Sequence, residues 1–117
     1  MGKVLVVDDE KNLLLLLQQI IEEYGHEVEL AANGQQALKL MESAPPALVF
    51  SDVMMPMMDG YQLLKHIKAR PEWKNIKVVL ISAAPINRTF EPHADAYLSK
   101  PYDLFTIEEI LDRMVVA

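Results

Sequence analysis

Three mainly apolar runs divide the chain, and each ends at a polar side chain. The runs cover residues 3–7, 47–51 and 76–81, and the polar residues at their carboxyl ends are Asp8, Asp52 and Ser82. Continuous rather than alternating apolar positions are typical of strands covered on both faces, as in parallel sheets flanked by helices. We therefore expect three buried parallel strands that bring these polar groups to one edge of a sheet.

Segments with helical periodicity separate the strands. We expect helices over residues 10–24, 35–43, 61–70 and 104–115, with Gly25 ending the first and Asp103 capping the last. The residues expected to face the core in the first helix are Leu13, Leu16, Leu17, Ile20 and Tyr24. Leu14 and Leu15 fall outside that face, which leaves two interpretations: packing under neighbouring loops, or a surface for a partner. The inward residues expected in the other helices are Ala37, Leu38, Met41, Leu63, Leu64, Ile67, Ile107, Ile110, Leu111 and Met114.

Two shorter strands complete the pattern. Residues 26–31 alternate polar and apolar, as in an edge strand, and residues 94–99 lead directly into Lys100. Residues 72–75 are expected to form a loop. Residues 83–92 contain two prolines and little helical periodicity, which predicts a shortened or irregular fourth helix. The whole pattern predicts one α/β domain over residues 1–117, a doubly wound five-stranded parallel sheet with strand order 2-1-3-4-5.

Composition narrows the functions that this domain can have. The 117 residues are 51% hydrophobic, enough for one core, and 11 basic against 17 acidic side chains give a net charge of −6. A basic face for nucleic acid is therefore not expected, and a cationic ligand or partner is favoured. The chain has no cysteine, no apolar run near the roughly 20 residues that span a bilayer, and no signal-peptide pattern at its start. We expect a cytoplasmic protein without membrane insertion.

The predicted strand order places a cluster of charges at the switch point between the first and third strands. Asp8, Asp9 and Asp52 converge there, and Lys100 and Ser82 arrive from the fifth and fourth strands. Two like charges about 4 Å apart repel by roughly 4 kcal/mol at an effective dielectric near 20, so the cluster calls for a cation. Carboxylate oxygens without histidine or cysteine favour Mg²⁺. Taken singly, each residue also has an ordinary interpretation as a helix cap, a loop carboxylate or a surface cation.

Four segments carry a resemblance to a known family. They are Val-Val-Asp-Asp-Glu at residues 6–10, Asp-Val-Met-Met-Pro-Met-Met-Asp-Gly at 52–60, Ser82-Ala83, and Tyr-Leu-Ser-Lys-Pro at 97–101. In order and spacing the chain resembles, over its whole length, the receiver domain of two-component response regulators, which has a flavodoxin-like fold. The resemblance implies a signalling domain, not an enzyme with turnover, that acts through protein contacts.

The resemblance also implies a role for each candidate residue. Asp52 would accept a phosphoryl group from the phosphohistidine of a sensor histidine kinase or a histidine phosphotransfer protein. Asp9 and Asp52 would ligate Mg²⁺ directly, Asp8 through water and Met54 through its backbone carbonyl. Lys100 would pair with the phosphoryl oxygens. These roles agree with the charge that phosphoryl transfer leaves on the equatorial oxygens, and a carboxylate nucleophile needs no general base.

Ser82 and Tyr97 resemble the family's switch pair, in which a hydroxyl drawn to the phosphoryl group makes room for an aromatic ring. The alternative is that Tyr97 is only a half-buried strand residue. The segment from Ser82 to Lys100 is shorter than is usual in the family, so we expect a non-standard output surface. Met54 and Ala84 occupy positions that tune the lifetime of the aspartyl phosphate, and neither side chain can hold an attacking water. Slow self-hydrolysis is therefore expected.

Two other functions compete with this hypothesis. A phosphorylation-independent adaptor would keep the fold without the switch, but the carboxylates, the hydroxyl and the lysine are all present. A small Mg²⁺-dependent phosphohydrolase would need a second acid/base group beside its nucleophile, and Val53 and Met54 supply none. Turnover of a phosphomonoester would favour the hydrolase. The downstream target, or any fused output domain, cannot be read from the sequence.

Overall fold

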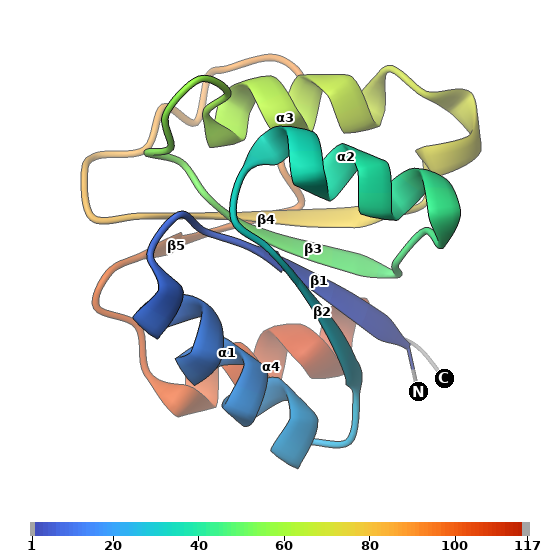
Figure 1. Ribbon diagram of the computed structural model, residues 1–117. Helices are drawn as coiled ribbons and strands as arrows, with labels where there is room; N and C mark the ends of the chain where they lie inside the picture. The colour runs from blue at the N-terminus through green and yellow to red at the C-terminus, as the bar shows by residue number, and fades with distance from the viewer. Residues whose placement is uncertain (1, 116–117) are drawn as a thin grey trace.

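Five parallel strands form one sheet at the centre of the computed structural model, which describes residues 2–115 (Figure 1). The strands are β1 (Lys3–Val7), β2 (Glu27–Ala31), β3 (Leu48–Asp52), β4 (Lys77–Ser82) and β5 (Ala96–Ser99). Their order, β2-β1-β3-β4-β5, confirms the predicted topology. The middle strand β3 is buried at every position, as its unbroken apolar run predicted.

Four helices cover the two faces of the sheet. Helices α1 (Lys11–Glu23) and α4 (Leu104–Met114) lie on one face, and α2 (Gly34–Ser43) and α3 (Gly60–Lys68) lie on the other (Figure 1). Side-chain caps begin three of them. Asn33 accepts a hydrogen bond from the Gln36 amide, Asp59 forms a capping box with Gln62, and Asp103 caps α4 as predicted.

The predicted inward face of α1 was wrong in part: Leu17 is buried and Ile20 is half-buried against the core as predicted, but Leu16 and Tyr24 are not. The residues that pack on the sheet are Leu14, Leu17 and Ile21, whereas Leu16 and Tyr24 are 49% and 38% exposed. Because five consecutive leucines occupy residues 13–17, every direction around the helix is apolar there, and the leucines alone cannot define the buried stripe. Leu14 thus belongs to the core, and Leu15 is 46% exposed.

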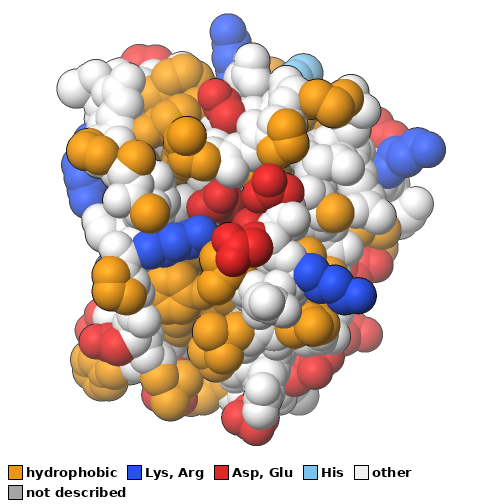
Figure 2. Space-filling model, turned by 60° about the vertical axis from the view of Figure 1, so that its left-hand side comes forward, with side chains coloured by type: hydrophobic (Ala, Val, Ile, Leu, Met, Phe, Trp, Pro, Cys, Tyr) orange, Lys and Arg blue, Asp and Glu red, His pale blue; other side chains and the backbone are white. Residues whose placement is uncertain are grey.

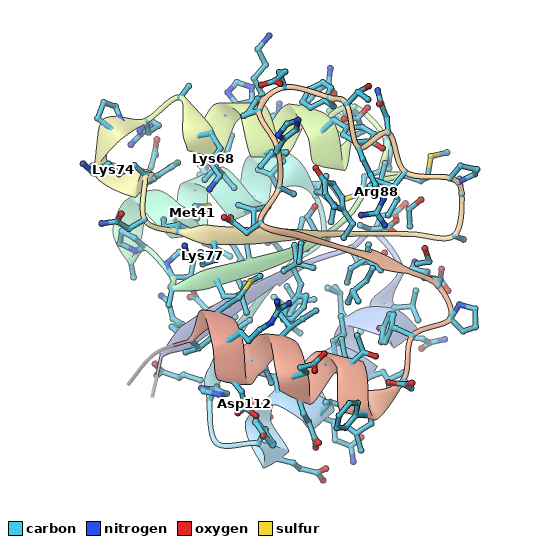
Figure 3. All side chains as sticks on the ribbon, turned by 180° about the vertical axis from the view of Figure 1, so that it is seen from behind. Met41, Lys68, Lys74, Lys77, Arg88 and Asp112 are labelled. Carbon is cyan, nitrogen blue, oxygen red and sulfur yellow. The ribbon has the colours of Figure 1, made fainter. Side chains whose placement is uncertain are left out.

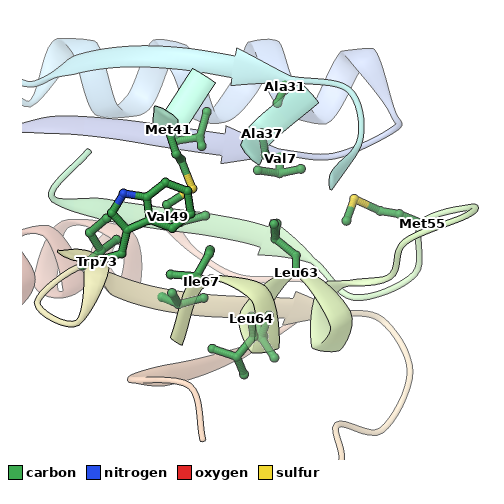
Figure 4. Close-up of a cluster of buried hydrophobic side chains, with 14 of the residues drawn as sticks. Val7, Ala31, Ala37, Met41, Val49, Met55, Leu63, Leu64, Ile67 and Trp73 are labelled. Carbon is green, nitrogen blue, oxygen red and sulfur yellow. The ribbon is translucent and has the colours of Figure 1, made fainter. Parts of the chain in front are cut away.

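The other helices bury the residues predicted for them, except that Leu38 and Met114 are only half-buried. The segment after α3 is more ordered than expected. Leu63, Leu64 and Ile67 are buried against the sheet. Pro71–Trp73 forms a 3-10 helix, η1, where a loop was predicted. The Trp73 side chain is 2% exposed and closes the core cluster between the sheet and the helices α2 and α3 (Figure 4). The 3-10 helix places the large apolar ring of Trp73 in the core, whereas an open loop would leave that ring exposed to water.

Residues 83–95, all of which the structure describes, contain no helix. The predicted irregularity between β4 and β5 is therefore confirmed, and the fourth helix is absent and not only shortened. Prolines at 85 and 92 explain the loss, because each lacks an amide donor and restricts the residue before it. The ends of the predicted domain, residues 1 and 116–117, lie outside the described residues. No helix within residues 2–115 is long and apolar enough to cross a membrane.

Candidate functional site

Three carboxylates meet where β1 and β3 end. In the register of these strands Val7 lies opposite Ser51, so Asp8 and Asp52 leave the sheet side by side. One oxygen each from Asp8, Asp9 and Asp52 lies within 4.8 Å of the others. Asp8 and Asp52 are only 5% and 7% exposed, whereas Asp9 is exposed. Figure 2, which shows this edge of the molecule, has acidic side chains at its centre with a basic side chain beside them.

Lys100 supplies the positive charge in the site. Its Nζ lies 3.1 Å from Oδ1 of Asp52 and 3.8 Å from Oδ2 of Asp8. The lysine follows β5 directly, and its amide donates to the Ser82 carbonyl at 2.8 Å, which fixes the backbone beside the end of β4. The long side chain can therefore reach across β4 to the end of β3. One ammonium faces three carboxylates, so the site keeps an excess of negative charge.

The environment of the carboxylates opposes their ionisation. Burial raises the pKa of Asp8 to about 6, and the charge of Asp52 adds to the rise, while the Glu10 amide and Lys100 oppose it. Burial also raises the pKa of Asp52, although its hydrogen bond from Lys100 acts in the other direction. The pKa of the nearby Tyr102 phenol is raised by burial and by the charges of Asp8 and Asp52. The metal-free site therefore holds ionised carboxylates at a cost in stability.

Asp8→Asn should stabilise the metal-free protein at pH 7. The pKa of Asp8 lies above its ordinary value of 3.8, so the stability linked to its protonation is present below pH 3.8 and lost as the pH rises through about 6. Asparagine carries no charge to desolvate, and we expect a gain of roughly 1–2 kcal/mol at pH 7 that disappears near pH 4. Urea unfolding in EDTA at both pH values measures it.

The exposed Asp112→Asn is the matched control and should change little at either pH. A less stable Asp8→Asn protein in EDTA at pH 7 would contradict the assignment of a destabilising buried charge.

The donors in this cluster are hard oxygen atoms, and they suit a divalent cation such as Mg²⁺. Within residues 2–115, Asp8, Asp9 and Asp52 are the acidic or histidine side chains found close enough together to hold a metal ion. The three predicted carboxylates are thus brought together, with two of them shielded from water. Mg²⁺ is commonly bound by one or two carboxylates and several waters, which this small open set of ligands allows.

The remaining predicted residues lie around the cluster without joining it. Ser82 is buried at the end of β4, and its Oγ accepts a hydrogen bond from the Ala84 amide at 3.0 Å. Tyr97 is half-buried on β5, and its hydroxyl accepts from the Ala94 amide at 3.1 Å. The Met54 side chain is 65% exposed, directly after the strand end. The structure therefore places Tyr97 against residues 83–95 and not against the carboxylates.

Three residues near the site were not singled out from the sequence. Gly60 packs against the backbone of Asp52, and the Asp-Gly pair that contains it was the available signal. Tyr102 is close enough to Asp8 and Asp52 for their charges to raise its pKa. Its position two residues after Lys100 could have indicated that it lies near the site. Arg88 lies over the ring of Tyr97, 4.8 Å from its centroid, and nothing in the local pattern indicated that contact.

Comparison with known proteins identifies the family. Residues 4–112 match the family model of the response regulator receiver domain. The chain is 36% identical over 114 residues to the sporulation initiation phosphotransferase F of Bacillus subtilis, covering 94% of this chain and 88% of that protein. It is also 34% identical to the response regulator Rre1 of Synechocystis, of which it covers 51%. The chain spans about half the length of this response regulator and of several other relatives.

Solved structures agree with this result. The receiver domain of a signal transduction histidine kinase from Syntrophus aciditrophicus superposes with a TM-score of 0.91 at 31% identity, over 98% of this chain and 90% of that one. The response regulator TrrA of Thermotoga maritima, in complex with Mg²⁺ and BeF, gives a TM-score of 0.88 at 32% identity, over 97% and 99% of the two chains. The chain belongs to the receiver domains of two-component response regulators, a family of signalling domains.

Proposed function

We propose that this chain accepts a phosphoryl group on Asp52 in a Mg²⁺-dependent reaction and changes its protein contacts in response. The observation that carries the proposal is the convergence of three carboxylates and Lys100 at one strand end. We further propose that residues 1–117 act as one receiver unit. A bound Mg²⁺ would neutralise charge on the carboxylates and on the transferring phosphoryl oxygens.

Each residue of the site has a distinct role in the proposal. Asp52 attacks phosphorus through a carboxylate oxygen, so that an O–P bond forms while the N–P bond of a donor phosphohistidine breaks. Asp9 and Asp52 would hold the metal directly, Asp8 would hold it through water, and Met54 would hold it through its backbone carbonyl. Lys100, already 3.1 Å from Asp52, turns to pair with a phosphoryl oxygen. The Ser82 hydroxyl donates a hydrogen bond to another phosphoryl oxygen.

Apolar side chains around the acidic site favour a protein as the phosphoryl donor. Met57 is 89% exposed on the loop after β3, and Phe105 is 70% exposed in the first turn of α4, which follows Lys100. Exposed apolar groups of this size beside a charged site are typical of protein contacts. A sensor histidine kinase or a histidine phosphotransfer protein fits both the apolar rim and the chemistry of the site. The relative named a phosphotransferase is consistent with such a relay.

Intact-mass spectrometry with acetyl phosphate as the donor tests the proposal. We expect one phosphoryl adduct in the presence of Mg²⁺ and none in EDTA. Absence of an adduct both with acetyl phosphate and with phosphorylated donor protein would favour the phosphorylation-independent adaptor. Repeated turnover of a phosphomonoester without a stable adduct would favour the phosphohydrolase.

The aspartyl phosphate should decay slowly. The thioether of Met54 is exposed beside the site and neither it nor the methyl group of Ala84 can hold an attacking water by a hydrogen bond. Met54→Asn introduces an amide that can, and we expect it to shorten the lifetime of the adduct by about tenfold, a typical gain from positioning one reactant. Timed mass spectra after removal of acetyl phosphate measure the decay. The isosteric Met54→Leu should decay like the wild type, and equal lifetimes for the Asn and Leu variants would contradict the explanation.

A further inference from the structure

Residues 83–95, which we call the β4–β5 segment, are held by two tyrosine hydroxyls. The Asn87 amide donates to the Tyr61 hydroxyl at 2.6 Å, and the Ala94 amide donates to the Tyr97 hydroxyl at 3.1 Å. Neither tyrosine belongs to the segment, since Tyr61 lies in the first turn of α3 and Tyr97 lies on β5. The segment therefore lies on the face of the sheet that carries α3, tethered through side chains, where a helix would have made its own hydrogen bonds.

Stacking contacts reinforce both tethers. The Phe90 ring lies 5.0 Å from the Tyr61 ring, and the Arg88 guanidinium lies 4.8 Å from the centroid of the Tyr97 ring. Figure 3 shows Arg88 on the β4–β5 segment near the end of β4. Tyr97 is thus held twice by the same segment, through its hydroxyl and through its π face. A change in the χ1 rotamer of Tyr97, which moves both the ring and its hydroxyl, would break both contacts.

The β4–β5 segment also begins at the hydroxyl that is proposed to sense the phosphoryl group. Ser82 Oγ accepts from the Ala84 amide at 3.0 Å, one residue inside the segment. When that oxygen moves toward a phosphoryl group on Asp52, the Ala84 amide loses its acceptor. The Ala84 contact therefore competes directly with phosphoryl binding, and the Ala94 contact competes with rotation of Tyr97. Asp95 at the end of the segment stays bonded to Val78 and Lys68.

We propose that Arg88 latches the β4–β5 segment onto Tyr97 in the unphosphorylated protein and that phosphorylation of Asp52 releases this segment. The inference rests on the proposed phosphoryl acceptance by Asp52. It assigns the output of this domain to a loop with charged, exposed residues, Arg88 among them. Because the latch and the phosphoryl group favour different conformers, linkage requires that weakening one strengthens the other.

Amide hydrogen exchange followed by NMR tests the release directly. The probes are the amides of Ala84, Asn87 and Ala94, each of which donates to a side-chain oxygen. Mg²⁺ with beryllofluoride serves as the stable phosphoryl mimic on the full chain. We expect exchange at the amides of Ala84 and Ala94 to rise by about fivefold when the mimic binds, the factor expected for loss of one hydrogen bond. Unchanged exchange in the mimic-bound protein would overturn the latch while leaving phosphoryl acceptance intact, and failure to bind either the mimic or a phosphoryl group would overturn both.

Variants of Arg88 test its role in the latch. Arg88→Gln should bind Mg²⁺-beryllofluoride about two- to fivefold more tightly than the wild type, the factor expected from loss of an exposed cation–π contact, and should raise Ala94 exchange without the mimic. Arg88→Lys keeps a cation over the ring, and its affinity for Mg²⁺-beryllofluoride should lie between those of the wild type and Arg88→Gln. Arg70→Gln is the matched control, because Arg70 also stacks on an aromatic ring, that of Trp73, at 4.0 Å. The contacts of Arg70 all lie outside the β4–β5 segment. Equal affinities for the wild type and Arg88→Gln would refute the latch.

Discussion

Asp52→Asn is expected to abolish formation of the phosphoryl adduct. The amide is nearly isosteric with the carboxylate but is not a competent nucleophile toward phosphorus, and it also removes a direct ligand of the proposed metal site. With acetyl phosphate and Mg²⁺, the rate of adduct formation should fall by at least about a hundredfold, the scale of losses when a nucleophile is removed. Intact-mass spectra taken over time measure the rate.

Two further variants make this result specific. Asp112→Asn is the same chemical change on α4, where Asp112 accepts a hydrogen bond from Tyr24 far from the site (Figure 3), and it should be phosphorylated like the wild type. Lys100→Met should slow the reaction without preventing it, because Asp52 remains. Asp52→Asn itself should stay folded, since it removes a buried charge whose pKa is raised by burial. Full adduct formation on Asp52→Asn would place the phosphoryl group on another residue.

The site was predictable because topology alone brings its residues together. Each buried strand is an apolar run, and the residue after the run has to leave the sheet at the same edge as its neighbours. Asp8, Asp52 and Lys100 stand directly at such ends, so their meeting follows from strand order without knowledge of any side-chain contact. The irregularity of residues 83–95 was predictable for a similar reason, because proline has a local and strong effect on the backbone, although a shortened helix was also expected and none forms.

The errors occurred where several tertiary arrangements satisfy the same local pattern. The leucines of α1 allow a buried stripe in any direction, and it is the packing of Leu14, Leu17 and Ile21 on the sheet that selects one. The contact of Arg88 with Tyr97 joins residues from an irregular segment and an edge strand, and no periodicity connects them. Local sequence therefore predicts where a strand ends more reliably than which side of a leucine-rich helix is buried.

Gly60→Ala is expected to damage both stability and the site, because Gly60 packs against the backbone of Asp52, the proposed phosphoacceptor. A Cβ atom on Gly60 would lie 2.6 Å from the Asp52 carbonyl oxygen and 2.9 Å from Cα of Val53. These are backbone atoms of a buried strand end, and the Gly60 amide is itself bonded to the Val53 carbonyl at 2.9 Å. We expect a loss of about 3 kcal/mol, the upper range for overpacking, and a fall in the melting temperature of roughly 10–15 °C.

Gly34→Ala is the matched control for this prediction. Gly34 is also the first residue of a helix, but its Cβ would meet the side chain of Met58, which is flexible and can move aside. Gly34→Ala should therefore leave the free energy of unfolding nearly unchanged. Below its melting temperature, Gly60→Ala should form the adduct at least about tenfold more slowly. Displacing the Asp52 carbonyl would shift the Asp52 carboxylate relative to Lys100 and the other carboxylates of the site. If Gly60→Ala matched Gly34→Ala in both stability and adduct rate, the close packing of α3 on the end of β3 would not be what positions Asp52.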